Sequence, residues 1–197
     1  ETALSVAPIT LPTHASLLTG LYPYHHGARN NGTFTLSKDV ETLAQRFRAA
    51  GYTTEAIVSA AVLDSRYGLD RGFQRYDDDL YGGHDKLFMF QEVRADVSVD
   101  KALRRLEAAD GPLFLWLHLF DAHADYEPPP PYDVLFRDSP YDGEIAWLDA
   151  QLGRLADALD PETLLVVTAD HGDSLGEHGE NTHGIFVYRS ATHVPCS

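Results

Sequence analysis

Cysteine, positive charge and long apolar runs are scarce in this sequence of 197 residues. The single cysteine, Cys196, excludes an internal disulfide framework and a zinc cluster held by cysteines. Lys and Arg number 15 against 30 Asp and Glu, a formal net charge of −15, so we expect no nucleic-acid binding, which needs clustered positive charge. No apolar run approaches the roughly 20 residues of a membrane span, so no transmembrane segment is predicted.

The residues that are present describe a folded domain. Hydrophobic residues make up 44% of the sequence and aromatic residues 11%, which is typical of a folded protein. Apolar residues at helical spacing alternate with short apolar runs, and this favours an α/β fold with a mostly parallel central sheet and helices on both faces. With no internal repeat or linker, we expect residues 1–197 to form a single domain. The predicted helices are 13–19, 43–50, 92–109 and 141–159, and the predicted strands are 52–60, 113–119 and 164–168.

The segment TADHGD at residues 168–173 is the strongest chemical signal in the chain. It follows the apolar run 164–167, which predicts a buried strand that delivers Asp170 and His171 to the carboxyl edge of the sheet. A carboxylate and an imidazole side by side can hold a divalent cation, and Gly172 allows a sharp turn beneath them. The pattern indicates a metal site without specifying the metal.

A second signal is TLPTHASLLTG at residues 10–20, which predicts a hydroxyl close to the start of a helix. A helix N-terminus offers unpaired N–H groups and the positive end of the dipole, so Thr10 is a good position for a nucleophile that attacks an anionic ester. Coordination to a cation would lower the pKa of the Thr10 hydroxyl. Taken alone, a threonine and a proline before a helix are also an ordinary helix start.

A third group of polar residues follows the apolar run 113–119. Asp121 and His123 leave that predicted strand together, and His183 lies further along the loop that begins at Asp170. An Asp-x-His pair alone is weak evidence for a site, because a polar strand end explains it more often. All three segments nevertheless lie just beyond predicted strands, where an α/β protein collects its active site.

Together these segments resemble the sulfatase-type branch of the alkaline phosphatase superfamily. TLPTHASLLTGLYP at residues 10–23, with His26 and Gly27 after it, resembles the nucleophile motif of that family. TADHGDSLGEHG at residues 168–179 resembles its second metal-binding motif. Residues 121–129 resemble the substrate-facing loop, and YDGEI at 141–145 resembles the helix after it. The resemblance runs in family order from about residue 5 to residue 195 and implies an alkaline phosphatase-like sandwich.

The nucleophile position departs from sulfatases proper. Their Cys/Ser-x-Pro-x-Arg motif is oxidised to formylglycine, whereas the matching positions here are Thr10, Pro12 and His14. Threonine cannot become that aldehyde, so formylglycine is not expected and classical sulfate-ester hydrolysis is less favoured. The pattern is more similar to the nucleotide pyrophosphatase/phosphodiesterase branch, in which threonine attacks phosphorus. The resemblance therefore implies a double displacement with Thr10 as the covalent nucleophile and water activated by a metal or by His123.

The resemblance also implies one or two divalent metal ions. Asp170, His171 and Thr10 would hold the first. In a two-metal version Asp121, His123 and His183 would supply a second; in a one-metal version His123 and His183 would contact the oxyanion and leaving group of a small anionic ester. Zinc, manganese and calcium are the candidate ions, with a transition metal favoured because the site is rich in histidine.

Two further expectations complete the prediction. The competing function is a non-catalytic relative that keeps the fold as a binding or scaffold module. In the family, a first strand that ends in acidic metal ligands precedes the nucleophile, and only residues 1–9 precede Thr10. We therefore expect this stretch alone to have an incomplete metal site and little or no activity.

Overall fold

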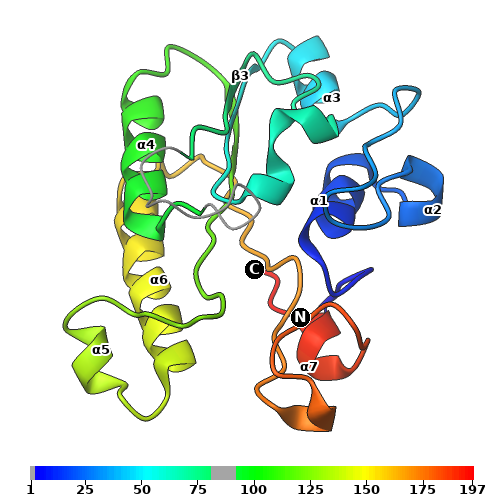
Figure 1. The fold of residues 1–197 in the computed structure, drawn as a ribbon. Coiled ribbons are helices and arrows are strands. Elements are labelled where there is room, and N and C mark those ends of the chain that lie inside the picture. The colour runs from blue at the N-terminus through cyan, green and yellow to red at the C-terminus, as the bar shows by residue number, and fades with distance from the viewer. Residues whose placement is uncertain (1–2, 81–91) are drawn as a thin grey trace. The chain divides into compact units, whose positions relative to one another are not determined.

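The computed structural model describes residues 3–80 and 92–197 and divides the chain into two compact units. The first unit contains the described parts of residues 1–51, 62–73 and 164–197, and the second those of 52–61 and 74–163. Figure 1 labels the helices α1 to α7 and the strand β3. Whether residues 1–197 act as the single domain expected from the sequence stays a prediction.

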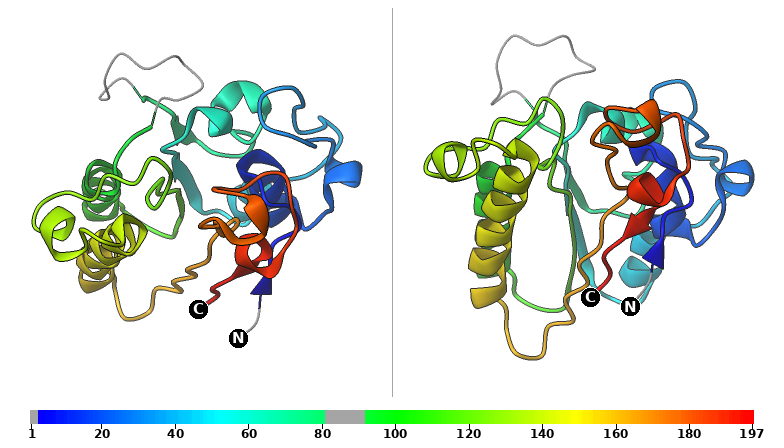
Figure 2. Two further views of the ribbon diagram at one scale, coloured as in Figure 1. Left: turned by 60° about the horizontal axis from the view of Figure 1, so that its bottom comes forward. Right: turned by 90° about the horizontal axis from the view of Figure 1, so that it is seen from below.

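The second unit is built on a parallel sheet of three strands in the order β3-β2-β4. Its strands are β2 (Thr53–Ile57), β3 (Arg75–Asp77) and β4 (Leu113–Leu117). Two long helices, α4 (Ala95–Glu107) and α6 (Pro140–Asp157), run side by side next to this sheet, and the short helix α5 (Tyr132–Leu135) lies beside α6 (Figure 1 and Figure 2). The parallel sheet flanked by helices confirms the predicted α/β class.

Apolar side chains from β2, α4 and α6 meet in one buried cluster, which explains why these elements pack together. Its buried members are Ile57, Val99, Ala102 and Leu155, with Leu103, Leu106, Leu115, Leu117 and Leu119 packed against them. Burying such leucine, isoleucine and valine side chains contributes on the order of 1.5–3 kcal/mol each. The apolar residues at helical spacing that predicted α4 and α6 therefore include those that pack in this cluster.

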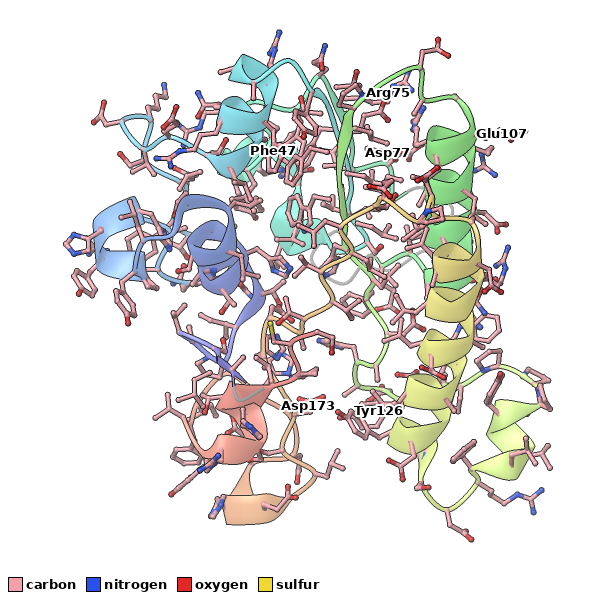
Figure 3. All side chains as sticks on the ribbon, turned by 180° about the vertical axis from the view of Figure 1, so that it is seen from behind. Phe47, Arg75, Asp77, Glu107, Tyr126 and Asp173 are labelled. Carbon is pink, nitrogen blue, oxygen red and sulfur yellow. The ribbon has the colours of Figure 1, made fainter. Side chains whose placement is uncertain are left out.

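Polar bonds tie the carboxyl edge of the sheet together. The Ser59 hydroxyl donates to the backbone oxygen of His118 at 2.6 Å, its oxygen lies 2.8 Å from the Ser98 hydroxyl, and the Ser59 N–H donates to Nδ1 of His118 at 3.3 Å. At β3, the ammonium of Lys101 on α4 bonds Asp77 at 2.7 Å, and Figure 3 shows Asp77 beside that helix. The Ser59 contacts hold His118, at the start of the segment that leads to Asp121 and His123.

The first unit combines short helices with a small antiparallel sheet. Its helices are α1 (Thr10–Thr19), α2 (Pro23–His26), α3 (Leu43–Ala49) and α7 (Arg189–Thr192), with 3₁₀ turns at Ala61–Leu63, Ser65–Tyr67 and Glu177–Gly179, the first of which begins in the neighbouring unit. Strand β1 (Ala3–Leu4) pairs antiparallel with β5 (His193–Val194). A capping box starts α3, since Thr42 and Gln45 exchange side-chain and backbone bonds of 3.2 and 2.9 Å.

The prediction of a buried strand at 164–168 is wrong. The run pairs through Val167, whose N–H and C=O both bond Ser197 at 3.0 Å, and through an isolated antiparallel bridge from Thr168 to Cys196. Leu164 is 88% exposed. An apolar run becomes a buried strand only where neighbouring strands meet its backbone groups, and within this unit residues 195–197 are the neighbour instead.

Candidate active site

Thr10 is the first residue of α1, three positions earlier than the predicted start of that helix. Its extended neighbour Ile9 is the N-cap, and Pro12 within the first turn has no N–H. The N–H of Leu11 donates to the side-chain oxygen of Asn31 at 2.9 Å. One of the N–H groups expected to be unpaired at the helix start is thus bonded to a side chain of the protein, and Asn31 helps to fix the start of α1. No sequence signal pointed to Asn31, because it reaches α1 from a separate loop.

The Thr10 hydroxyl meets the residues of the TADHGD segment. Its oxygen lies 3.3 Å from Nε2 of His171, and the same Nε2 lies 3.4 Å from Oδ2 of Asp170. On the other side of the ring, Nδ1 of His171 is 3.0 Å from the backbone oxygen of Gly172. In a neutral ring that donates from Nδ1, the lone pair is on Nε2 and points at the space that Thr10 and Asp170 also face.

His14 lies behind this group, one helical turn after Thr10. Its side chain is 7% exposed, its Nδ1 is 3.0 Å from the backbone oxygen of Thr10, and the same nitrogen is 3.6 Å from Oδ2 of Asp170. Burial lowers the pKa of His14, while the Asp170 charge and the bond to Thr10 oppose that shift. The ring therefore links the backbone of the proposed nucleophile to Asp170.

His183 joins the group through its ring and is held by a carboxylate. The rings of His171 and His183 have centroids 4.0 Å apart, and Nδ1 of His183 lies 2.8 Å from Oδ1 of Asp173. Both side chains are largely buried, at 12% exposed for His183 and 6% for Asp173, which Figure 3 labels. Asp173 orients a predicted site residue, although the sequence showed it only as the end of the TADHGD segment.

The loop after His183 is held by Glu180, a buried carboxylate. Its Oε1 accepts the N–H of Ile185 at 2.8 Å, and its Oε2 accepts the N–H of Phe186 at 3.2 Å. These two bonds close the loop around His183 and Gly184. Glu180 is a second structural residue that sequence reasoning missed, since its partners are backbone groups and carry no sequence signature.

Asp121 and His123 belong to the second unit. The Asp121 carboxylate accepts the N–H of Ala95 at 2.8 Å, at the start of α4. Burial raises the pKa of Asp121, opposed by this bond and by the charge of Arg94. Nδ1 of His123 lies 2.6 Å from the backbone oxygen of Ala124. The roles of Asp121 as a metal ligand and of His123 as a base or substrate contact stay predictions.

The donor atoms around Thr10 fit a cation. Ligand atoms at about 2.1 Å from a tetrahedral ion are about 3.4 Å from one another. The 3.3 and 3.4 Å separations of Nε2 of His171 from the Thr10 oxygen and from Asp170 match that spacing. In the neutral ring that donates from Nδ1, the Nε2 lone pair and the Asp170 carboxylate converge with no proton between them, and such a pair favours a positive ion. Residues 3–80 and 92–197 contain no group of three or more His, Cys, Asp or Glu side chains placed to bind a metal, so the described donor set is Asp170 and His171 with one hydroxyl.

The sequence prediction contained no membrane span, and in the part of the chain that the structure describes no helix is long and apolar enough to cross a bilayer.

The chain is similar to known proteins over almost its whole length. The family model described as Sulfatase matches residues 2–196. The uncharacterized sulfatase YidJ of Escherichia coli K12 is 22% identical, with 99% of this chain and 54% of that protein aligned. The phosphonate monoester hydrolase of Agrobacterium radiobacter superposes with a TM-score of 0.77 at 19% identity, over 98% of this chain and 59% of that one. BT4656, solved with its substrate D-glucosamine-2-N,6-O-disulfate, gives a TM-score of 0.77 at 17% identity, over 100% of this chain and 62% of that one. The chain thus spans between about half and two thirds of the length of these relatives.

Proposed function

The chain belongs to the sulfatase family, and from this we propose that the full-length protein hydrolyses sulfate or phosphate esters with Thr10 as its covalent nucleophile. The observation that carries the proposal is the 3.3 Å approach of the Thr10 hydroxyl to Nε2 of His171, beside Asp170. A hydroxyl at a helix start, next to a ring lone pair and a carboxylate, has the surroundings of an activated nucleophile. The structural relatives include a phosphonate hydrolase and a protein that binds a sulfated sugar, and both ester classes agree with the proposal.

Asp170, His171 and Thr10 would hold a divalent cation in this site. Such an ion would lower the pKa of the Thr10 hydroxyl and offset the charge of the ester. The remaining ligands are not assigned. Zinc or manganese suits the histidine-rich donor set better than calcium.

The proposed reaction has two displacements. In the first, Thr10 releases its hydroxyl proton to water, its oxygen bonds phosphorus or sulfur, and the bond to the leaving alcohol oxygen breaks. A protonated histidine, His183 or His123, donates a proton to that leaving oxygen. In the second, a neutral His123 takes a proton from water, the water oxygen bonds phosphorus or sulfur, and the bond to the Thr10 oxygen breaks. The Thr10 oxygen takes up a proton from water, and the acid product leaves as a phosphate monoester, a phosphonate or inorganic sulfate, according to the substrate.

Phosphorus chemistry is the favoured version. Position 10 is threonine, which cannot form the aldehyde hydrate that sulfatases proper use, so the hydroxyl itself must attack. A phosphodiester or phosphonate is the substrate class that this simple alkoxide chemistry favours, with the sulfate ester as the second candidate.

The test uses three variants of the full-length protein on paired aryl phosphodiester, aryl phosphonate and aryl sulfate substrates. Thr10→Ala should abolish turnover on every substrate, Thr10→Ser should retain part of it, and Thr19→Ala at the other end of α1 should behave as the wild type. Unchanged turnover in Thr10→Ala would refute the nucleophile. A wild-type protein inactive on all three substrates would favour the scaffold function.

A further inference from the structure

Glu144 is a buried carboxylate whose two oxygens both bind the loop after β4. It is 5% exposed and lies in the second turn of α6. Oε2 accepts the N–H of His123 at 3.0 Å, and Oε1 accepts the N–H of Glu127 at 2.7 Å. Since burying a carboxylate is costly unless it is well bonded, a two-point attachment of this kind holds the backbone on either side of residues 124–126.

Other residues of α6 pack against the same loop. The rings of Tyr141 and Tyr126 meet edge to face with centroids 5.3 Å apart, and Figure 3 shows Tyr126 beside this helix. At Gly143 a Cβ atom would lie only 2.9 Å from Cγ of Pro128. The first turns of α6 therefore pack against residues 123–128. Gly143 allows Pro128 to approach the helix closely, and Glu144 accepts hydrogen bonds from the loop backbone.

The hydrogen bonds that Glu144 makes in the described part of the chain go to backbone N–H groups, and it forms no salt bridge there. Burial raises the pKa of the Glu144 carboxyl above its ordinary value, the two N–H bonds oppose that shift, and the charges of Asp121 and Glu92 add to it. A carboxylate without a cationic partner contributes little by charge pairing. Its geometric effect is to fix the shape of the loop.

The His123 ring is the group on this loop that the proposed function uses. Its Nδ1 lies 2.6 Å from the Ala124 oxygen, and its ring packs on Phe120 with centroids 4.4 Å apart. In a neutral ring that donates from Nδ1, the lone pair is on Nε2. Because the backbone nitrogen of the same residue is held by Glu144, a shift of that attachment moves the ring with it.

We propose that Glu144 is a positioning residue for ester hydrolysis: it holds the backbone of His123 so that the imidazole meets the ester in the productive orientation. This inference rests on the proposed function, in which His123 contacts the ester or activates water. Glu144 acts through His123 and does not itself touch the substrate.

The test is a double-mutant cycle in the full-length protein. Glu144→Gln keeps the size of the side chain but turns an N–H₂ group toward one of the two backbone N–H groups. We expect kcat/KM to fall about 10- to 100-fold, mainly through kcat, since misplacing a catalytic group by about 1 Å costs that much. Adding His123→Ala should then cost little more, because both changes remove the same contribution. The control, Glu107→Gln on the exposed face of α4, should leave kcat/KM unchanged.

Additive effects of Glu144→Gln and His123→Ala, or wild-type kcat in Glu144→Gln, would overturn the proposal. If Glu144→Gln does not fold, Glu144→Asp and hydrogen exchange of the wild type replace it. The amides of His123 and Glu127 should exchange slowly in the wild type, and fast exchange would also overturn the inference. A wild type without ester hydrolysis contradicts the proposed function instead, so the two failures are distinguishable.

Discussion

Thr10 and His171 are separated by 161 positions in the sequence, yet the hydroxyl oxygen of one lies 3.3 Å from Nε2 of the other. Asp170 and His14 surround this contact, at 3.4 Å from Nε2 of His171 and 3.0 Å from the Thr10 backbone oxygen respectively. Four residues from the two ends of the chain thus form one polar group at the start of α1. Variants of this group and of the residues that hold it in place should therefore change activity or stability.

Removing metal should abolish activity. The full-length protein should contain at least one divalent ion per chain, and chelation should lower ester hydrolysis at least 10-fold, with recovery on adding zinc, manganese or calcium. Asp170→Ala should lower the metal content measured by elemental analysis, and Asp39→Ala, on an exposed loop, should not. Full activity in a metal-free, chelated sample would contradict the metal assignment.

Removing the carboxylate that orients His183 should slow the reaction. Asp173→Ala deletes the 2.8 Å partner of Nδ1 of His183, and loss of such an orienting partner typically costs 10- to 100-fold. Asp173→Asn keeps an acceptor oxygen and should retain more activity. Steady-state kcat/KM, measured beside the exposed control Asp39→Ala, gives the comparison. Equal activity in Asp173→Ala and the control would show that His183 needs no such partner.

The glycine after His171 is required by a close backbone approach. A Cβ atom at Gly172 would overlap the backbone oxygen of Ser190, and the N–H of Gly172 bonds Ala191 at 2.9 Å. Gly172→Ala should therefore lower the free energy of unfolding by about 1–3 kcal/mol and displace His171, with a loss of kcat of at least about 10-fold.

The matched control for that change is Gly153→Ala inside α6, where nothing lies within 4 Å of the added Cβ. It should leave activity unchanged and raise the free energy of unfolding by about 0.5–1 kcal/mol. Denaturant unfolding measures both variants. Wild-type stability and activity in Gly172→Ala would show that the loop adapts without cost.

Acid should destabilise the first unit through His26. This buried ring bonds the Ser16 hydroxyl at 3.0 Å and accepts the N–H of Ala28 at 3.2 Å, and burial lowers its pKa. A lowered pKa means that the unfolded state takes up a proton first as pH falls. The stability that neutral His26 provides is complete above about pH 6.5 and is lost as pH falls through its folded pKa.

The measurement is the free energy of unfolding between pH 7.5 and 5. His26→Asn should be less stable at pH 7.5 and should show a shallower fall with acid, by part of the roughly 1.4 kcal/mol per pH unit that one proton allows. Thr19→Ala, at the other end of α1, removes no titratable group and should keep the wild-type slope. An unchanged slope in His26→Asn would assign the acid sensitivity to another group.

Local patterns in the sequence determined most of the elements and the chemical identity of the candidate site. Helical spacing that includes Ala102, Leu103 and Leu155 predicted the two helices that pack on the sheet, because packing requires one apolar face. Thr10, Asp170 and His171 could be named because each stands in a motif whose residue types already suit ester chemistry. The continuous apolar run 164–167 gave a wrong prediction of a buried strand. An apolar run becomes a buried strand only where neighbouring segments pair with it and cover it.

Tertiary structure alone decided which residues support the site. Asn31, Glu144 and Glu180 bond the backbone N–H groups of other residues, and every residue except proline carries such a group, so no pattern of side chains reveals these contacts. The pairing of Asp173 with His183 likewise depends on how the loop folds back. The residue types show which reactive groups the chain carries, and their motifs already resemble the sulfatase family to which the chain belongs. The fold decided how these groups are oriented, because hydrogen-bond geometry exists only once the loops have closed.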